Sequence, residues 1–199
     1  MSYSTRFDDA LVFASRVHRD QTRKGGPIPY ITHLLGVASL IGDHGGSEDQ
    51  VIAGLLHDAV EDGVEHIPDI EAQILERFGA QVLEIVLACS DTTTHPKPPW
   101  RERKQAYIDH VEAAADDDPA LLISAADKLH NLTTMLRDHD LHGDALWDRF
   151  NATPEQSLWY YQRLSAALNA KRWPTQLQAQ IAAQLARRVE DFAGVIDVK

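Results

Sequence analysis

The stretch VIAGLLHDAVED, residues 51–62, combines an apolar stripe with four polar side chains. Its apolar residues recur at the three- and four-residue spacing of a helix that packs against a core. They are Val51, Ile52, Leu55, Leu56, Ala59 and Val60. The polar residues also fall three or four positions apart, so a helix gathers them at one end of one face. They are His57, Asp58, Glu61 and Asp62. The stretch predicts a core helix with a histidine and three acids at its end.

The same helical periodicity runs through nearly the whole chain, and sustained strand-type alternation is missing. Turn signals rich in Gly, Pro and Asp divide the sequence into about nine or ten helical segments. These signals lie at 24–30, 43–49, 62–68, 78–80, 94–99, 116–119 and 172–174. The stretch 92–100 is expected to be a loop within the domain. The sequence therefore predicts an all-α fold.

The organisation that we expect is a single-domain helical bundle over residues 1–199. A chain of 199 residues, 44% of them hydrophobic, can bury one sizeable core. That core is expected over about 7–168, followed by a C-terminal helix over about 175–192. The apolar stripe of this last helix either packs on the core or forms a dimer contact, and packing is the favoured interpretation.

The net charge of -11 comes from 30 acidic residues against 19 Lys and Arg residues. Such a charge repels nucleic acids and anionic membranes, so neither is an expected partner. No segment approaches the roughly 20 apolar residues of a membrane helix. An anionic ligand would need local cations or a bound metal ion to offset the repulsion.

The cellular location that the sequence favours is the cytoplasm. Cys89 is the single cysteine, so the chain cannot form an intramolecular disulfide. The start MSYSTRFDDALVF also carries acids where a secretory signal has a basic region followed by an apolar run.

The crowded acids near His57 suggest a bound divalent cation, because they would otherwise repel one another. Adjacent His57 and Asp58 can converge on one ion, and mixed nitrogen and oxygen ligands suit manganese, iron, zinc or cobalt better than calcium. The alternative is an ordinary acidic helix end in which a carboxylate satisfies His57. Two further residues favour the metal: His33 follows an aromatic residue at a helix start in PYITH, and Asp127 lies in the apolar segment SAADKLHNL.

Cations near these residues predict a phosphate ligand. Asp127, Lys128 and Asn131 repeat at spacings of one, three and four, which places an acid, a cation and an amide near one helical face. Arg23 and Lys24 precede a Gly-rich turn, where they either face a phosphate or form a solvated pair.

Taken in order, the motifs around His33, His57, Asp58 and Asp127 resemble the HD superfamily of metal-dependent phosphohydrolases. More narrowly, four segments are similar to the hydrolase domain of RelA/SpoT alarmone enzymes and to their stand-alone relatives, the small alarmone hydrolases. These segments are RKGGPIPYITH at 23–33, LLHDAVED at 55–62, FGAQV at 78–82 and ADKLHNL at 126–132. The resemblance extends over about 7–168 and implies a helical bundle of the HD-domain type.

This resemblance implies removal of the 3′-pyrophosphate from a guanosine or adenosine alarmone such as ppGpp, with manganese as the usual ion. The metal ligands that it implies are His33, His57, Asp58 and Asp127. The acidic pair that activates or orients the attacking water is Glu61 and Asp62. Phosphate would face Arg23 and Lys24, and the nucleotide site would include Asn131 and Thr134, with Tyr160 or Tyr161 closing over it.

General chemistry agrees with these roles. A metal-bound water has a lowered pKa, and a nearby glutamate can take its proton, which makes Glu61 the candidate base. Further cations can offset the charge of a pyrophosphate. They are Arg101, Arg103, Lys104 and Lys128.

Two other functions stay open. One is a broader nucleotide phosphatase that acts on NADPH or nucleoside monophosphates through the same centre. The other is a module that senses a nucleotide without turning it over, although a pure sensor would not need Glu61 and Asp62. The expected partner is a small-molecule nucleotide, with a homodimer as a further possibility. The base preference also stays open, because TTTHPKPPWRERKQAY at 92–107 departs from the pattern of any one alarmone enzyme.

Overall fold

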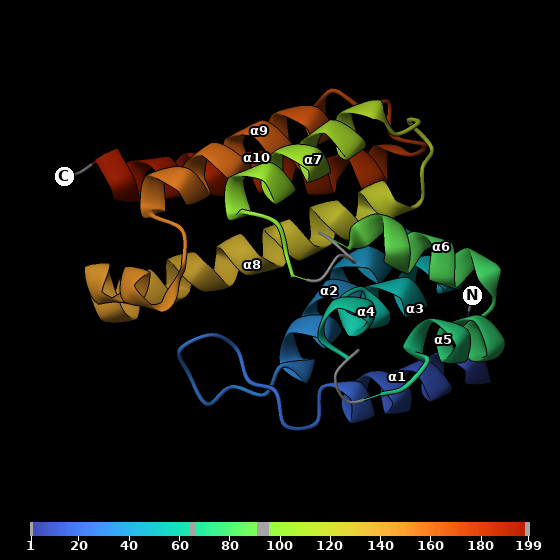
Figure 1. Ribbon diagram of the computed structural model, residues 1–199. Coiled ribbons are helices and arrows are strands. Elements are labelled where there is room, and N and C mark those ends of the chain that lie inside the picture. The colour runs from blue at the N-terminus through green and yellow to red at the C-terminus, as the bar shows by residue number, and fades with distance from the viewer. Residues whose placement is uncertain (1, 64–66, 91–95, 198–199) are drawn as a thin grey trace.

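The computed structural model describes residues 2–63, 67–90 and 96–197, which fold into ten α-helices and one 3-10 helix (Figure 1). The helices are α1 (Thr5–Val17), α2 (Ile31–Asp43), α3 (Glu48–Leu56), α4 (Ala59–Asp62), α5 (Ile70–Phe78), α6 (Ala80–Cys89), α7 (Trp100–Ala113), α8 (Ala120–His142), η1 (Gly143–Arg149), α9 (Pro154–Asn169) and α10 (Gln176–Asp197). Within the described ranges, one isolated antiparallel bridge joins Thr22 to Pro29. The prediction of an all-α fold is confirmed. Of the expected loop at 92–100, residues 92–95 lie outside the described residues, and 64–66 of the turn signal at 62–68 do so as well.

Side-chain caps stabilise the starts of α1, α3 and α9. Ser4 accepts a hydrogen bond from the backbone of α1. Ser47 and Gln50 form a capping box at α3, and Thr153 and Gln156 form another at α9. In each box the two side chains satisfy backbone N–H groups that the helix leaves unpaired. The capping box at Ser47 thereby fixes the start of α3, the helix that ends just before His57.

The continuous helix predicted over 51–62 is wrong at two residues. The structure ends α3 at Leu56 and begins α4 at Ala59, so His57 and Asp58 lie in a turn between them. In a continuous helix, neighbouring side chains diverge by about 100° around the axis. The turn, with Asp58 at φ -95° and ψ -3°, instead lets both side chains approach one point. The apolar periodicity continues across the turn and therefore did not reveal it.

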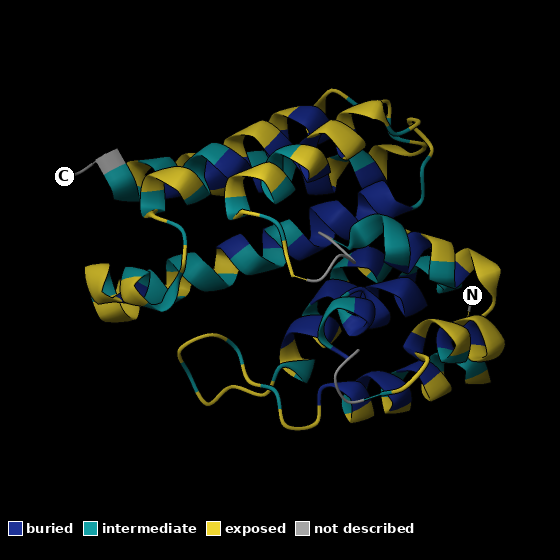
Figure 2. Cartoon of the chain, in the orientation of Figure 1, coloured by how far each residue is buried: buried dark blue, intermediate teal, exposed yellow. Residues whose placement is uncertain are grey.

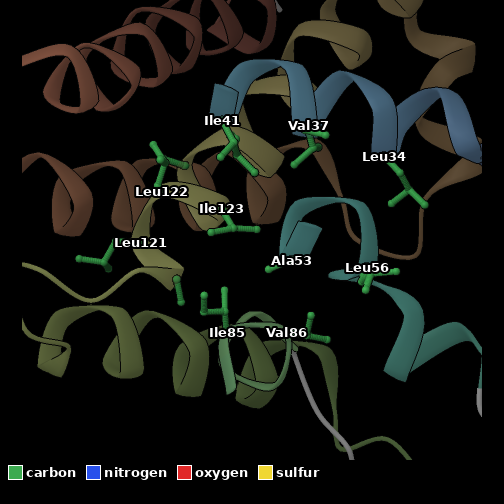
Figure 3. Close-up of a cluster of buried hydrophobic side chains, with 14 of the residues drawn as sticks. Leu34, Val37, Ile41, Ala53, Leu56, Ile85, Val86, Leu121, Leu122 and Ile123 are labelled. Carbon is green, nitrogen blue, oxygen red and sulfur yellow. The ribbon is translucent and has the colours of Figure 1, made fainter. Parts of the chain in front are cut away.

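The hydrophobic core lies among α2, α3, α6 and the first half of α8. Figure 3 shows side chains from all four helices gathered in one cluster, among them Leu34, Leu56, Ile85 and Ile123. The buried stretches in Figure 2 follow the same helices. Because α2, α3 and α8 pack against one another, polar residues on their facing ends are brought together.

The C-terminal helix α10 packs along α8 and α9. Its side chains Ile181, Leu185 and Phe192 are buried in the same cluster that begins at Ala10 in α1. We propose on this basis that residues 1–199 form a single domain. Among the described residues, no helix has an apolar run long enough to cross a membrane.

Candidate metal centre

Four side chains from three parts of the chain converge at one point. His33 comes from the first turn of α2, His57 and Asp58 from the turn after α3, and Asp127 from α8. One ligand atom each of His33, His57 and Asp58 lies within 4.8 Å of the others. The Oδ1 of Asp127 lies 3.1 Å from Nε2 of His33 and 3.6 Å from Nε2 of His57. Ligands bound about 2.1 Å from an ion lie about 3 to 4 Å apart, so the spacing suits a transition metal.

His57 shows that a cation fits between these groups. Its Nδ1 lies 2.8 Å from the carbonyl oxygen of Gly54 and donates its proton there, so Nε2 is the ring atom that faces the cluster. That Nε2 is buried and makes no hydrogen bond with the described residues, but it lies 3.1 Å from Asp58 Oδ2 and 3.6 Å from Asp127 Oδ1. Burial acts to lower the pKa of His57, but the two carboxylates outweigh it and raise that pKa well above its ordinary value. The position of Nε2 therefore favours a positive charge, and a divalent ion would supply it, so the residues present fit a metal.

His33 is oriented by a second histidine that sequence reasoning missed. The Nδ1 atoms of His33 and His130 lie 2.9 Å apart. Burial, together with the nearby His33 and Arg23, lowers the pKa of His130 to about 4, so this ring is neutral near pH 7 and can accept a hydrogen bond from Nδ1 of His33. Burial also lowers the pKa of His33. A neutral His33 that donates through Nδ1 presents the lone pair of Nε2 to the ion.

The close approach of Gly36 to His130 leads to a first prediction. A Cβ at position 36 would overlap the His130 ring. We expect Gly36→Ala to displace this ring and to weaken Mn²⁺ binding by about 10- to 100-fold, as the loss of an outer-shell partner does. Titration calorimetry of the purified variant would measure the loss. Gly194→Ala is the matched control, because a Cβ there meets nothing within 4 Å. Equal Mn²⁺ affinity in both variants would contradict the role of His130.

Asp58 is held by Tyr30, another residue that was not predicted to belong to the site. The Oη of Tyr30 donates a hydrogen bond of 2.6 Å to Asp58 Oδ2. Burial acts to raise the pKa of Asp58, but the adjacent His57 and His33 outweigh it and hold that pKa below its ordinary value. Asp58 is therefore ionised, as a metal ligand must be. The aromatic position before His33 was visible in the sequence, but its partner was not.

Asp127 connects the candidate metal centre to other polar side chains on α8. Lys128 forms an ion pair with its Oδ2, and Asn131 Nδ2 donates to its Oδ1 at 2.5 Å. Arg23 in turn donates to Asn131 Oδ1 at 2.6 Å and to Thr134 Oγ1 at 3.4 Å. The structure thus brings four of the predicted substrate-binding residues into one network next to the predicted ligand Asp127.

The remaining predicted substrate-binding residues lie apart from this network. Lys24 is exposed in the loop before α2, and no hydrogen bond or ion pair links it to the other described residues. Tyr160 is buried, and its ring lies 4.9 Å from Nζ of Lys104. Tyr161 packs edge-on against Phe192 of α10. Of the two tyrosines, Tyr160 is the one in contact with the predicted cationic residues.

Glu61 and Asp62, which follow the turn at His57 and Asp58, contact different partners. Glu61 Oε2 lies 3.2 Å from Nζ of Lys97, and Asp62 Oδ2 accepts a hydrogen bond of 2.8 Å from Gln21. Burial and the neighbouring Asp58 raise the pKa of Glu61 above its ordinary value, although Lys97 opposes the shift. A raised pKa makes Glu61 a better proton acceptor than an exposed glutamate once it is ionised.

Cations from α7 lie on the same side as Glu61. Burial and the neighbouring Lys128 and Arg103 lower the pKa of Lys104 to about 7. The guanidinium of Arg101 stacks over the Trp159 ring, 3.1 Å from its centroid. Two of the predicted cations on α7, Arg101 and Lys104, thus lie against the aromatic rings of Trp159 and Tyr160.

Comparison with known proteins places these residues in a family. A model of the HD domain matches residues 10–152. The guanosine-3′,5′-bis(diphosphate) 3′-pyrophosphohydrolase MESH1 of Homo sapiens is 41% identical over 133 residues, which cover 65% of this chain and 69% of that protein. The bifunctional (p)ppGpp synthase/hydrolase SpoT of Escherichia coli K12 is 29% identical over 177 residues, or 87% of this chain and 23% of that protein.

Solved structures share the arrangement of helices. A protein of Listeria monocytogenes superimposes with a TM-score of 0.68 at 30% identity, over 79% of this chain and 96% of its own. A metazoan ortholog of SpoT gives a TM-score of 0.71 at 24% identity, over 94% and 97% of the two chains. The matched segment 10–152 contains the whole cluster of His33, His57, Asp58 and Asp127, and this chain belongs to the HD domain family.

Proposed function

We propose that this protein is a manganese-dependent hydrolase that removes the 3′-pyrophosphate of ppGpp. The observation that carries the proposal is the buried cluster of two histidines and two carboxylates, in which His57 Nε2 makes no hydrogen bond with the described residues and faces the carboxylates of Asp58 and Asp127. The 41% identity to human MESH1, an enzyme named for this reaction, supports the choice of substrate. Mixed histidine and carboxylate ligands support manganese.

The metal would be held by His33, His57, Asp58 and Asp127. A bound divalent ion lowers the pKa of coordinated water and offsets charge on a phosphoryl oxygen. Glu61 would accept the proton of the attacking water, and Asp62 would orient that water. Lys97, at 3.2 Å from Glu61, favours the ionised carboxylate that this role needs.

Phosphate groups would be bound by cations from three segments. Arg23 is held by Asn131 and Thr134 of α8, Lys128 lies on the same helix, and Lys104 lies on α7. A pyrophosphate placed there gains charge-assisted hydrogen bonds that offset the repulsion from the net charge of -11. We propose that the local cations, rather than the overall charge, determine binding.

A comparison of substrates tests the proposal. Purified protein loaded with Mn²⁺ would be incubated in parallel with ppGpp, pppApp, NADPH and dAMP, and the phosphate products would be separated. We expect pyrophosphate from ppGpp and no pyrophosphate when EDTA removes the metal, because a bound ion would lower the pKa of the attacking water.

Other outcomes of the same assay contradict the proposal in different ways. Pyrophosphate from pppApp alone would assign the enzyme to adenosine alarmones. Orthophosphate from NADPH or dAMP alone would indicate a broader phosphatase. Bound Mn²⁺ without turnover of any compound would indicate a nucleotide sensor.

A further inference from the structure

Three side chains form a hydrogen-bonded row that ends on Asp62. His18, at the end of α1, lies with its Nδ1 2.5 Å from Oε1 of Gln21. Gln21 Nε2 then donates to Asp62 Oδ2 at 2.8 Å. His18 and Asp62 are thus joined through one amide, although 41 residues separate Gln21 from Asp62. The proposed mechanism so far uses neither His18 nor Gln21.

Hydrogen-bonding chemistry determines which group donates at each contact of this row. An ionised carboxylate only accepts hydrogen bonds, so the NH₂ group of Gln21 must face Asp62 and its carbonyl oxygen must face His18. That oxygen also only accepts, so Nδ1 of His18 must carry a proton. The row therefore has one arrangement, in which His18 donates to Gln21 and Gln21 donates to Asp62.

The start of the row is fixed by packing. The His18 ring is 2% exposed and stacks on Tyr30, with ring centroids 5.1 Å apart and planes at 25°. Tyr30 is the residue that donates to Asp58. One segment, residues 18–30, therefore holds both Asp58 and Asp62, and the stacked rings link the two contacts.

We infer that Gln21 is a positioning residue that fixes the carboxylate of Asp62, with His18 setting the orientation of the Gln21 amide. The inference rests on the proposed function, because it assigns the role of orienting water to Asp62. A donor on Oδ2 restricts rotation of the carboxylate and directs Oδ1 to the water. Among the described residues, the hydrogen bonds of the Gln21 side chain go to His18 and Asp62 and not to the four metal ligands or to the network around Arg23, so its effect on turnover can be separated from binding.

The test compares Gln21→Leu and Gln21→Glu with the wild-type protein. Leucine removes the donor, and glutamate places a second carboxylate against Asp62. We expect kcat for ppGpp to fall about 10- to 100-fold in Gln21→Leu and further in Gln21→Glu, with KM and Mn²⁺ affinity within about twofold of wild type. Gln105→Leu is the matched control, because Gln105 donates a similar hydrogen bond of 2.6 Å to Asp109 in α7.

A second readout does not depend on turnover. The side-chain amide resonances of Gln21 in the full-length protein should shift in Asp62→Asn, because the carboxylate acceptor is lost. The amide resonances of Gln105 should stay in place. Unchanged Gln21 resonances would overturn the contact itself.

The outcomes separate this inference from the proposed function. If wild-type protein does not hydrolyse ppGpp, the proposed function fails and the amide resonances still test the row. If wild-type protein hydrolyses ppGpp and Gln21→Leu keeps its full kcat, the positioning role is overturned. If Gln21→Leu binds Mn²⁺ more weakly, or if its melting temperature falls along with its activity, the role of Gln21 is structural. The inference then fails.

Discussion

Replacement of His57 by alanine is expected to abolish metal binding and hydrolysis together. His57 Nε2 is buried beside the carboxylates of Asp58 and Asp127, so the ion would lose a ligand that the protein cannot replace. The loss of an outer-shell partner already costs about 10- to 100-fold in affinity, and the loss of a direct ligand should exceed that range. Titration with Mn²⁺ measures the affinity, and the ppGpp assay measures the activity.

Thermal denaturation gives an independent check on His57→Ala. An ion that binds only the folded state stabilises it by about 2.7 kcal/mol at a concentration 100 times its Kd. Added Mn²⁺ should therefore raise the melting temperature of the wild-type protein but not that of His57→Ala. His142→Ala, at an exposed position near the end of α8, should behave like wild type. A normal Mn²⁺-induced shift in His57→Ala would refute the assignment of this ligand.

Replacement of Glu61 by glutamine should have the opposite pattern, with the metal retained and turnover lost. A glutamine has nearly the same size but cannot accept a proton from water, and general-base catalysis contributes about 10²- to 10⁴-fold to rate. We expect kcat to fall within that range while Mn²⁺ affinity stays close to wild type. Steady-state kinetics and calorimetry on one preparation measure both quantities.

A matched control for this substitution is Glu112→Gln. Glu112, like Glu61, pairs with a cation at 3.2 Å, but its partner is Arg163 on the exposed surface between α7 and α9. Loss of such a surface ion pair costs at most about 1 kcal/mol of stability. Glu112→Gln should keep full activity. Full activity in Glu61→Gln would leave Asp62 or another group as the base.

Sequence pattern predicted the helices, and the resemblance to the HD superfamily predicted the set of residues at the metal site. Helix starts are local features: Ser47 and Gln50 lie three residues apart, so their capping box could be recognised without knowledge of the rest of the fold. The four predicted ligands do lie together. The apolar faces of α2, α3 and α8 pack in one core, and this packing brings the polar residues at the ends of these faces close to one another.

The partners that orient these residues became visible only in the tertiary structure. Tyr30 reaches Asp58 across 28 residues, Gln21 reaches Asp62 across 41, and His130 reaches His33 across 97. No spacing rule connects such positions, because the contacts depend on how whole helices pack. Lys24 illustrates the converse, since it neighbours Arg23 in sequence but is exposed outside the network that holds Arg23.

The sequence by itself determined the fold class, most helix boundaries and the chemical types of the metal ligands. These properties follow from periodicity, capping and residue chemistry, which act over a few residues. Only the tertiary structure decided the turn at His57 and Asp58, the orientation of each ligand and the separate partners of Glu61 and Asp62. Such features depend on hydrogen bonds and packing between distant segments, and those contacts form only when the complete core is assembled.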